Sequence, residues 1–423
     1  MQIVMGLVGI MSLIIIALIF SSNRKAINLR TVGGAFAIQA LIPAIVIFTD
    51  SGASVLGSIS SGVQAVINSA NAGIGFLFGG LVSGKMFEVF GGGGFVFAFR
   101  VLPIIIFFAS LMAVLYYMGI MQFIIKIFGG ALQKALGTSR TESMSAAANV
   151  FVGQTEAPLV VKPFIRTMTR SELFAVMAGG LASVAGAVLA GYASLGVSLD
   201  YLIAASFMAA PGGLLMAKLL EPETETPIDQ MEQLTDEELA ADEAAKPVNV
   251  IDAAASGASD GLHLAMNVGG MLIAFIALIA LINTILGALG SIFGIDALTL
   301  QQILGYVFAP IAFLIGVPWS EAMQVGSLLG QKLVVNEFVA YIDFVSIKDT
   351  LSANSQVIVT VALCGFANLS SMAILLGGLG VLAPSRRPDI ARLGLKAVLA
   401  GTLSNFMSAT LVGIFFAMSG GLI

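Results

Sequence analysis

The chain has 423 residues, of which 58% are hydrophobic and 10% are charged, and its formal net charge is -5. Soluble domains carry about 25% charged residues, so this composition excludes a soluble protein and indicates a polytopic membrane protein. Ten of the acidic residues lie between positions 221 and 243, and the sequence has no basic face for nucleic acid. The only cysteine, Cys364, excludes an intramolecular disulfide and a cysteine metal cluster. The only histidine, His263, is expected to have a structural role.

The apolar runs predict eight transmembrane helices, because a spanning helix needs about 20 mainly apolar residues. These spans are expected at residues 3–20, 33–48, 95–119, 172–195, 198–218, 257–287, 356–379 and 393–418. Three other segments have the spaced apolar residues of helices that lie in the membrane interface, namely 51–82, 120–135 and 296–309. The run 257–287 is longer than a perpendicular span needs, which predicts a strongly tilted helix.

The distribution of basic residues predicts the orientation of the chain. With the N-terminus outside, 15 lysines and arginines fall on the cytoplasmic side and four fall outside, which agrees with the positive-inside rule. Both termini then lie outside. The acidic segment 221–247 becomes a cytoplasmic linker, in which Thr235 and Glu238 are placed to cap a short helix over residues 235–246.

The stretch 142–168 is apolar but broken at its middle, and basic residues lie on both sides of it. The break contains Asn149, Gly153, Gln154, Thr155, Glu156 and Pro158. Charge of the cytoplasmic type at both ends predicts a re-entrant hairpin of two half-helices, each of about 10 residues. Residues 313–346 repeat the pattern, with Trp319, Glu321, Lys332, Asn336 and Glu337 at membrane depth.

Each hairpin precedes two predicted spans, but the first hairpin enters from inside and the second from outside. This order predicts an inverted repeat with a binding site at the repeat interface, near the midplane. The chain then divides into N-terminal spans and interfacial helices (1–135), a first repeat unit (136–218), an acidic loop (219–256), a long helix with an interfacial helix (257–312) and a second repeat unit (313–423).

The polar residues at these breaks are candidates for a ligand site. They come from three segments: Gln154, Thr155 and Glu156, then Asn336 and Glu337, then Asn368 and Ser371. The last two are three positions apart and would share one face of the seventh span, and Phe366 adds an aromatic surface. Carboxylates, amides, hydroxyls and a ring suit a neutral, flat, hydroxyl-rich ligand. The alternative is that these groups only bond helices together, but an acid in the membrane is costly without a function.

A second candidate site is one for a small cation, which needs clustered oxygen atoms. Asn149, the carbonyl groups exposed around Val152, and Ser183 on the adjacent small-residue span can supply such oxygens for Na⁺. This set predicts a Na⁺ site beside the first hairpin.

Three motifs resemble those of the concentrative nucleoside transporters. They are GQTEAP at 153–158, GQKLVVNEFVAY at 330–341 and GFANLSS at 365–371. The resemblance covers nearly the whole chain, and the second motif is highly specific. It implies a homotrimer of eight-span protomers, each with a scaffold at the trimer axis and a moving transport unit that contains both hairpins and works as an elevator.

The resemblance also implies roles for individual residues. Those implied in nucleoside binding are Gln154, Thr155, Glu156 and Val188 around the base, and Glu337, Asn368 and Ser371 around the ribose, with Phe366 close by. Those implied in Na⁺ binding are Asn149 and Ser183, with the backbone of Val152 and Val184. Thr155 after the glutamine favours sodium, because proton-coupled members of the family tend to have a different residue there.

These observations together predict a sodium-coupled symporter, not an enzyme, that imports nucleosides such as uridine across a bacterial inner membrane with both termini in the periplasm. Sodium would order the first hairpin against the fourth span and so complete the nucleoside site. A proton-coupled symporter, with Glu156 or Glu337 as the proton carrier, is the first alternative. An intramembrane enzyme with these two glutamates as acid and base is the second, although the sequence offers no nucleophile with a partner base, no metal triad and no cofactor loop.

Overall fold

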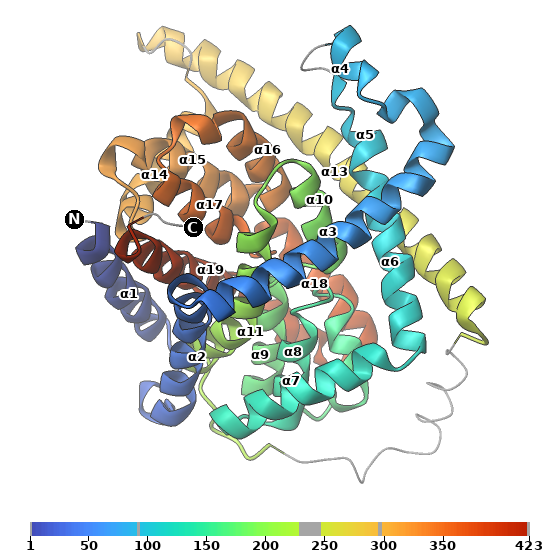
Figure 1. Ribbon diagram of the computed structural model, residues 1–423. Helices are drawn as coiled ribbons and strands as arrows, with labels where there is room; N and C mark the ends of the chain where they lie inside the picture. The colour runs from blue at the N-terminus through green and yellow to red at the C-terminus, as the bar shows by residue number, and fades with distance from the viewer. Residues whose placement is uncertain (1, 91–93, 228–246, 295–297, 421–423) are drawn as a thin grey trace.

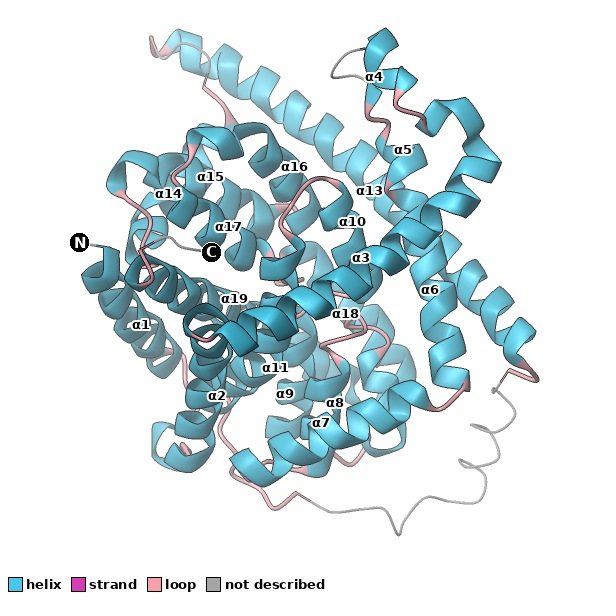
Figure 2. Ribbon diagram, viewed as in Figure 1, coloured by secondary structure: helices cyan, strands magenta, loops and turns pink. Residues whose placement is uncertain are grey.

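The structure is a computed structural model that describes residues 2–90, 94–227, 247–294 and 298–420 (Figure 1). Every element in these ranges is a helix (Figure 2), so the expected all-α fold is confirmed. The short helix expected at 235–246 lies outside the described residues. The elements before the first hairpin are α1 (Gln2–Ile19), η1 (Arg24–Ala26), α2 (Leu29–Phe48), α3 (Asp50–Phe78), η2 (Gly79–Val82), α4 (Lys85–Phe90), α5 (Phe97–Arg100), α6 (Leu102–Tyr117) and α7 (Ile120–Leu136).

The limits of these N-terminal helices follow from their capping residues. The Asn28 side chain accepts hydrogen bonds from two backbone N–H groups of α2, and the Thr49 side chain accepts one from α3. Gly119 and Gly137 flank α7 with φ of 75° and 67°, a backbone that glycine adopts without strain. Helices α3 and α7 occupy the segments expected to be interfacial, and their position in a membrane stays a prediction.

The first repeat unit is a hairpin followed by two packed helical segments. Its elements are α8 (Arg140–Ala148), η4 (Ala157–Phe164), α9 (Arg170–Ala182), α10 (Gly186–Ser194) and α11 (Leu199–Leu220). Capping boxes begin α8 and α9: Ser139 and Glu142 bond reciprocally, as do Thr169 and Glu172. The second arm of the hairpin is a 3₁₀ helix with Pro163 inside it, so only the first arm is the α-helix that the sequence predicts.

The second repeat unit has the same order of elements. They are α15 (Trp319–Val334), α16 (Glu337–Ile347), η5 (Lys348–Thr350), α17 (Ala353–Leu363), α18 (Leu369–Leu382), η6 (Pro384–Arg386) and α19 (Arg387–Met418). In Figure 1 the hairpin helix α8 lies in the lower half of the molecule, whereas α15 and α16 lie in the upper half. The two units are therefore arranged in opposite senses, as an inverted repeat requires.

Two spans that we expected to be continuous are broken. The expected fourth span, 172–195, consists of α9 and α10 with an extended connection at 183–185, and the expected seventh, 356–379, consists of α17 and α18 with a connection at 364–368. Each break lies within an otherwise apolar run, so hydropathy along the chain did not indicate that the helix would be interrupted there. The backbone groups freed at each break are bonded by neighbouring segments, which is what permits irregular backbone inside a helical membrane protein.

Long apolar helices account for the membrane character of the fold. Among the residues that the structure describes, eight helical segments are long and apolar enough to span a membrane; the segment 50–90 passes this test, whereas α17 and α18 are each too short. The number of possible spans is therefore as expected, but the segment 50–90 takes the place of the expected span 356–379. Helix α13 (Val250–Ile292) has 43 residues, about 65 Å at 1.5 Å per residue, and so exceeds a ~30 Å hydrocarbon core. It packs against α6 and leads to α14 (Leu300–Leu314).

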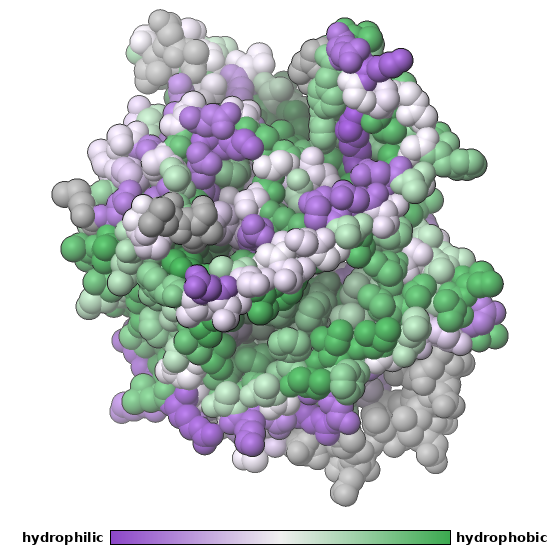
Figure 3. All heavy atoms as spheres, in the orientation of Figure 1, coloured by the Kyte–Doolittle hydropathy of each residue, from purple (hydrophilic) through white to green (hydrophobic). Residues whose placement is uncertain are grey.

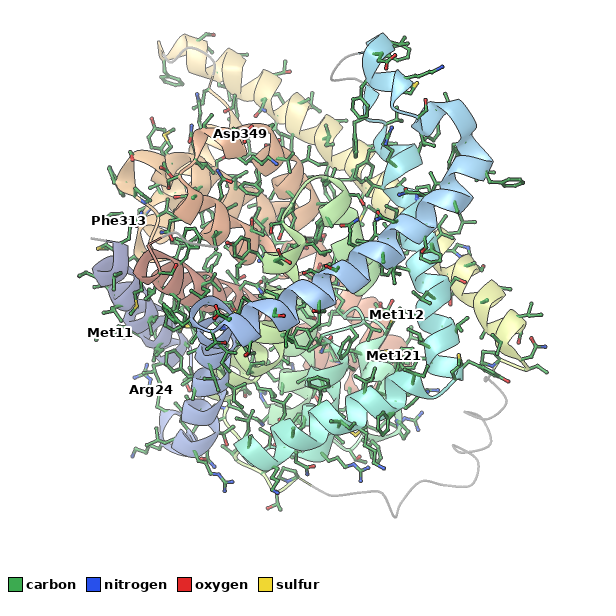
Figure 4. The ribbon with its side chains drawn as sticks, viewed as in Figure 1. Met11, Arg24, Met112, Met121, Phe313 and Asp349 are labelled. Atoms are coloured by element: carbon green, nitrogen blue, oxygen red, sulfur yellow. The ribbon has the colours of Figure 1, made fainter. Side chains whose placement is uncertain are left out.

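The surface agrees with this membrane character. On the face drawn in Figure 3, hydrophobic residues form a broad area between hydrophilic residues that gather at the top and at the bottom. Figure 4 places Arg24 toward the bottom and Asp349 toward the top, on the two sides that the distribution of basic residues predicts to be cytoplasmic and external.

Inside, the first repeat is very closely packed: a Cβ at Gly213 on α11 would lie 3.0 Å from Cα of Gly179 on α9.

Candidate functional site

A cavity of about 100 Å³ lies where the two hairpins meet the two helix breaks. It is lined by all eight residues predicted to bind substrate: Gln154, Thr155, Glu156, Val188, Glu337, Phe366, Asn368 and Ser371. The tertiary structure therefore brings together polar groups that come from four separate segments of the chain.

Glu337 is the first residue of α16 and is buried in the wall of this cavity. Its Oε2 accepts a hydrogen bond of 2.8 Å from Nδ2 of Asn368, and its Oε1 accepts one of 2.9 Å from the hydroxyl of Tyr192. The carboxylate also lies at a helix N-terminus, where the macrodipole favours negative charge. These contacts fix the orientation of the carboxylate at the edge of the cavity.

Asn368 is not on a helix face, as the spacing to Ser371 predicted, but is the N-cap of α18. Its Oδ1 accepts hydrogen bonds of 2.7 Å from the Ser371 backbone N–H and of 2.7 Å from the Ser370 hydroxyl. The prediction was wrong because the helix begins at Leu369, after the break. The same cap aims Nδ2 at Glu337, so one side chain both begins the helix and orients the acid.

The first hairpin supplies the opposite wall of the cavity. Gln154 is buried, and its Oε1 atom has no hydrogen-bond partner within the described residues. Because a buried acceptor without a partner is costly, this oxygen is available to a ligand. Glu156 is exposed and lines the same cavity. Val188, Phe338 and other apolar residues complete the wall, so polar groups face an apolar surface.

Two of the four residues predicted to bind Na⁺ are in contact, since the Ser183 hydroxyl lies 3.4 Å from Oδ1 of Asn149. Val152 and Val184 are both buried, and the N–H of Gly186 donates a 3.1 Å hydrogen bond to the carbonyl of Phe151, which joins the two segments. The donor set contains a hydroxyl, an amide and carbonyl groups, which are hard oxygen ligands suited to Na⁺. Within the described residues no group of three or more His, Cys, Asp or Glu side chains could hold a metal ion, so the candidate cation site is made of uncharged oxygens.

The two candidate sites are connected by backbone. The N–H of Phe366, in the second break, donates a 3.0 Å hydrogen bond to the carbonyl of Ser183, in the first break. A shift of Ser183 would therefore be transmitted to the ring of Phe366, which lines the ligand cavity.

A second cavity, of about 590 Å³, lies between the first hairpin, α6, α7 and α13. It shares Gly153, Glu156 and Ala185 with the first cavity. Met112 on α6 lines it, and Met121 on α7 is buried close by, toward the lower side in Figure 4. The ligand cavity is thus adjacent to an opening on the side where the first hairpin lies.

Sequence reasoning missed one residue of the site and misplaced another. Tyr192 was missed, although it follows Val188 by one helical turn and so lies on the same face of α10. The misplaced residue is Asn368, which caps α18 as described above. Lys332, expected at membrane depth in the second hairpin, bonds through Nζ to the carbonyl of Ala362 and to Oδ1 of Asn405. The lysine therefore does not line the cavity.

The inverted repeat, the paired hairpins and the broken helices around one polar cavity define the class as a secondary transporter. Family models agree on a more specific assignment. The Na⁺ dependent nucleoside transporter C-terminus matches residues 201–413, the corresponding N-terminus matches residues 8–81, and a nucleoside recognition domain called Gate matches residues 98–199. The chain belongs to the Na⁺ dependent nucleoside transporter family, for which Na⁺ is the coupling ion.

Similar proteins cover nearly the whole chain. The nucleoside permease NupC of Helicobacter pylori is 52% identical over 98% of each chain. The sodium/nucleoside cotransporter 1 of mouse is 36% identical over 97% of this chain and 64% of its own. A solved structure of CNTnw in an inward-facing substrate-bound state is 60% identical, covers 100% of each chain and has a TM-score of 0.95. This is a family of transporters, and the expectation of a nucleoside transporter is confirmed.

Proposed function

We propose that this protein is a sodium-coupled symporter that imports nucleosides such as uridine by an elevator mechanism. The observation that carries the proposal is the single cavity lined by both hairpin tips and both helix breaks. A ligand bound there contacts both repeats at once, so its binding depends on how the repeats are arranged. A ligand of this kind has a different affinity for each arrangement, which is what alternating access needs.

The base and the ribose are assigned to opposite walls of the cavity. Gln154, Thr155 and Glu156 contact the base, with Val188 beside it. Glu337, Asn368 and Ser371 hold the ribose, with Phe366 close by. The free Oε1 of Gln154 supports the first assignment, because it can accept a hydrogen bond from a base edge. The fixed carboxylate of Glu337 supports the second, because it can accept hydrogen bonds from sugar hydroxyls.

Sodium is assigned to Asn149, Ser183 and the carbonyls of Val152 and Val184. An ion bound there joins the first hairpin to the break between α9 and α10. Gln154 is close in the chain to Val152, and the backbone N–H of Phe366 donates a hydrogen bond to the carbonyl of Ser183. Ordering that junction therefore places Gln154 and Phe366 on the two walls of the cavity. Sodium and nucleoside therefore raise each other's affinity, as linkage requires.

The burial of the helices supports a moving unit and a scaffold. In their most apolar 18-residue parts, 89–94% of the residues are buried in α9–α10, α11 and α19. The corresponding share is 11–22% in α1, α2, α3, α6 and α13. The buried set, with both hairpins, forms the transport unit. The exposed set, led by α13, contacts lipid and two other copies of the chain in a homotrimer. The protein lies in the bacterial inner membrane with both termini in the periplasm.

The test is uptake of labelled uridine into liposomes that contain the purified protein. We expect concentrative uptake with an inward Na⁺ gradient and none when K⁺ replaces Na⁺. Uptake driven by an inward proton gradient without sodium would favour the proton-coupled alternative. Conversion of uridine to another compound during the incubation would favour the enzymatic alternative. Absence of uptake under every gradient, with folded protein, would contradict the substrate assignment.

A further inference from the structure

The two repeat units correspond at a constant separation in the chain. Glu156 and Glu337 are 181 positions apart, and the same separation carries Ser183 onto Cys364. The break between α9 and α10 therefore corresponds to the break between α17 and α18. The hairpin residues 149–152, which supply the proposed Na⁺ ligands, correspond to residues 330–333, which include Lys332.

In the second repeat, a charged side chain reaches the break. Lys332 is 1% exposed, and its Nζ donates hydrogen bonds of 2.6 Å to the carbonyl of Ala362 and of 2.7 Å to Oδ1 of Asn405. Ala362 lies at the C-terminal end of α17, where the unpaired carbonyl groups and the macrodipole attract cations. A buried cation in a membrane protein requires oxygen partners of this kind.

In the first repeat, the corresponding carbonyl end of α9 meets uncharged groups. The oxygen of Gly180 accepts a hydrogen bond of 3.3 Å from the Ser183 hydroxyl, and that of Ala182 accepts one of 2.6 Å from Nδ2 of Asn405. This is the place to which Na⁺ is assigned. Asn405 joins the two breaks, because its Nδ2 also donates to the carbonyl of Cys364 and its Oδ1 accepts from Lys332.

We propose that the ammonium group of Lys332 is a tethered cation that takes, in the second repeat, the place that Na⁺ takes in the first. The inference rests on the proposed Na⁺ site. The second break is then permanently ordered by a cation that cannot leave, whereas the first is ordered only while Na⁺ is bound. Of the two equivalent places, one exchanges its cation with the solution and the other does not, so Na⁺ controls the first break alone.

The experiment removes the tethered cation and offers a free one. Lys332→Ala deletes the ammonium group and leaves the oxygens of Ala362 and Asn405 open. We expect uridine uptake at fixed Na⁺ to fall about tenfold or more, because hydrogen bonds to a charged group are lost. Methylammonium should restore part of the uptake and raise the melting temperature of the purified variant, and the Na⁺ dependence should become steeper than that of the wild type.

Two variants serve as controls. Lys332→Met removes the charge but fills the space, so methylammonium should rescue neither its uptake nor its melting temperature. Lys348→Ala removes a half-buried lysine of the same repeat, whose Nζ bonds to the carbonyl of Gly196 and not to the break, and should behave as the wild type. If Lys332→Ala gives little folded protein, methylammonium in the purification buffer should raise its folded yield and leave that of Lys332→Met unchanged.

The outcomes separate the inference from the proposed function. The tethered cation alone would be overturned if wild-type uptake requires Na⁺ but the Lys332→Ala variant contradicts the inference. That variant would do so by showing an unchanged Na⁺ dependence, or by showing no response to methylammonium in uptake, stability and yield. Wild-type uptake without any need for Na⁺ would overturn the Na⁺ site and the inference with it.

Discussion

The side chains of Asn368 and Glu337 are joined by a hydrogen bond of 2.8 Å, which connects the residue that caps α18 to the residue that begins α16. Two helix N-termini thereby face the same part of the cavity. The partial positive charge of each N-terminus stabilises the carboxylate, and the carboxylate in turn fixes the amide. The second hairpin and the second break are held together at the point where the ligand is proposed to bind.

Glu337→Gln is expected to reduce uridine uptake by about tenfold or more. The substitution replaces one acceptor oxygen by an NH₂ group, which cannot accept, so the bond from either Tyr192 or Asn368 is lost and the other loses its charged acceptor. Hydrogen bonds to charged groups contribute about 1.5–3 kcal/mol each. Initial rates of uptake in liposomes measure the effect. Glu88→Gln, which changes an exposed carboxylate on α4, should leave uptake unchanged. Normal uptake by Glu337→Gln would remove this residue from the proposed site.

Tyr192→Phe is expected to raise the uridine concentration for half-maximal uptake several-fold, roughly the effect of one hydrogen bond. The variant loses the 2.9 Å bond to Glu337 but keeps the ring contacts with Phe338 and Tyr341. Tyr341→Phe is the matched control, because its hydroxyl donates to the carbonyl of Thr360 and not to the acid. Equal effects of the two variants on apparent affinity would show that Tyr192 only stabilises the fold.

Ser183→Ala is expected to raise the Na⁺ concentration for half-maximal uptake, with the apparent affinity for uridine at saturating Na⁺ little changed. The substitution removes one oxygen from the proposed ion site and leaves the ligand cavity intact. The Na⁺ dependence of uptake measures the effect at several uridine concentrations. Ser194→Ala, whose hydroxyl bonds only within its own helix, is the control. An unchanged Na⁺ dependence would contradict the assignment of the ion.

Glu221, at the C-terminal end of α11, is expected to make stability depend on pH. Its carboxylate lies 2.6 Å from both Arg170 and Lys396. Burial acts to raise the pKa of Glu221, but the hydrogen bonds and charges of Lys396 and Arg170 outweigh it, so the pKa lies below the ordinary value of 4.5. A lowered pKa in the folded state gives stability that is present above pH 4.5 and is lost as the pH falls through the folded value.

Glu221→Gln should therefore lower the melting temperature at pH 7, and the difference from the wild type should shrink as the pH is lowered below 4.5. Melting curves of the purified protein at several pH values measure it. Glu225→Gln, an exposed glutamate of the same segment, should show no such pH dependence. A difference between wild type and Glu221→Gln that stays constant with pH would contradict the ionic origin of the effect.

Several structural features were predictable because they depend on local sequence. Length and hydropathy predicted α1, α2, α11 and the long α13 closely, and the polar breaks after Asn149 and before Glu337 predicted the two hairpins. The motif around Glu337 led to the correct family. The breaks at Ser183 and Cys364 were not predictable in this way, because each lies within an otherwise apolar run and is held partly by bonds from a distant segment, such as those of Asn405 on α19.

The sequence by itself determined that this is a helical membrane protein with two polar hairpins, since apolar length and charge distribution act locally along the chain. The tertiary structure decided how these parts form a site. Tyr192 orients Glu337 across 145 positions of chain, and Asn405 bonds to the carbonyl of Ala182 across 223. Such pairs form only when the two repeats pack against each other, because each polar group must find a partner where water is excluded.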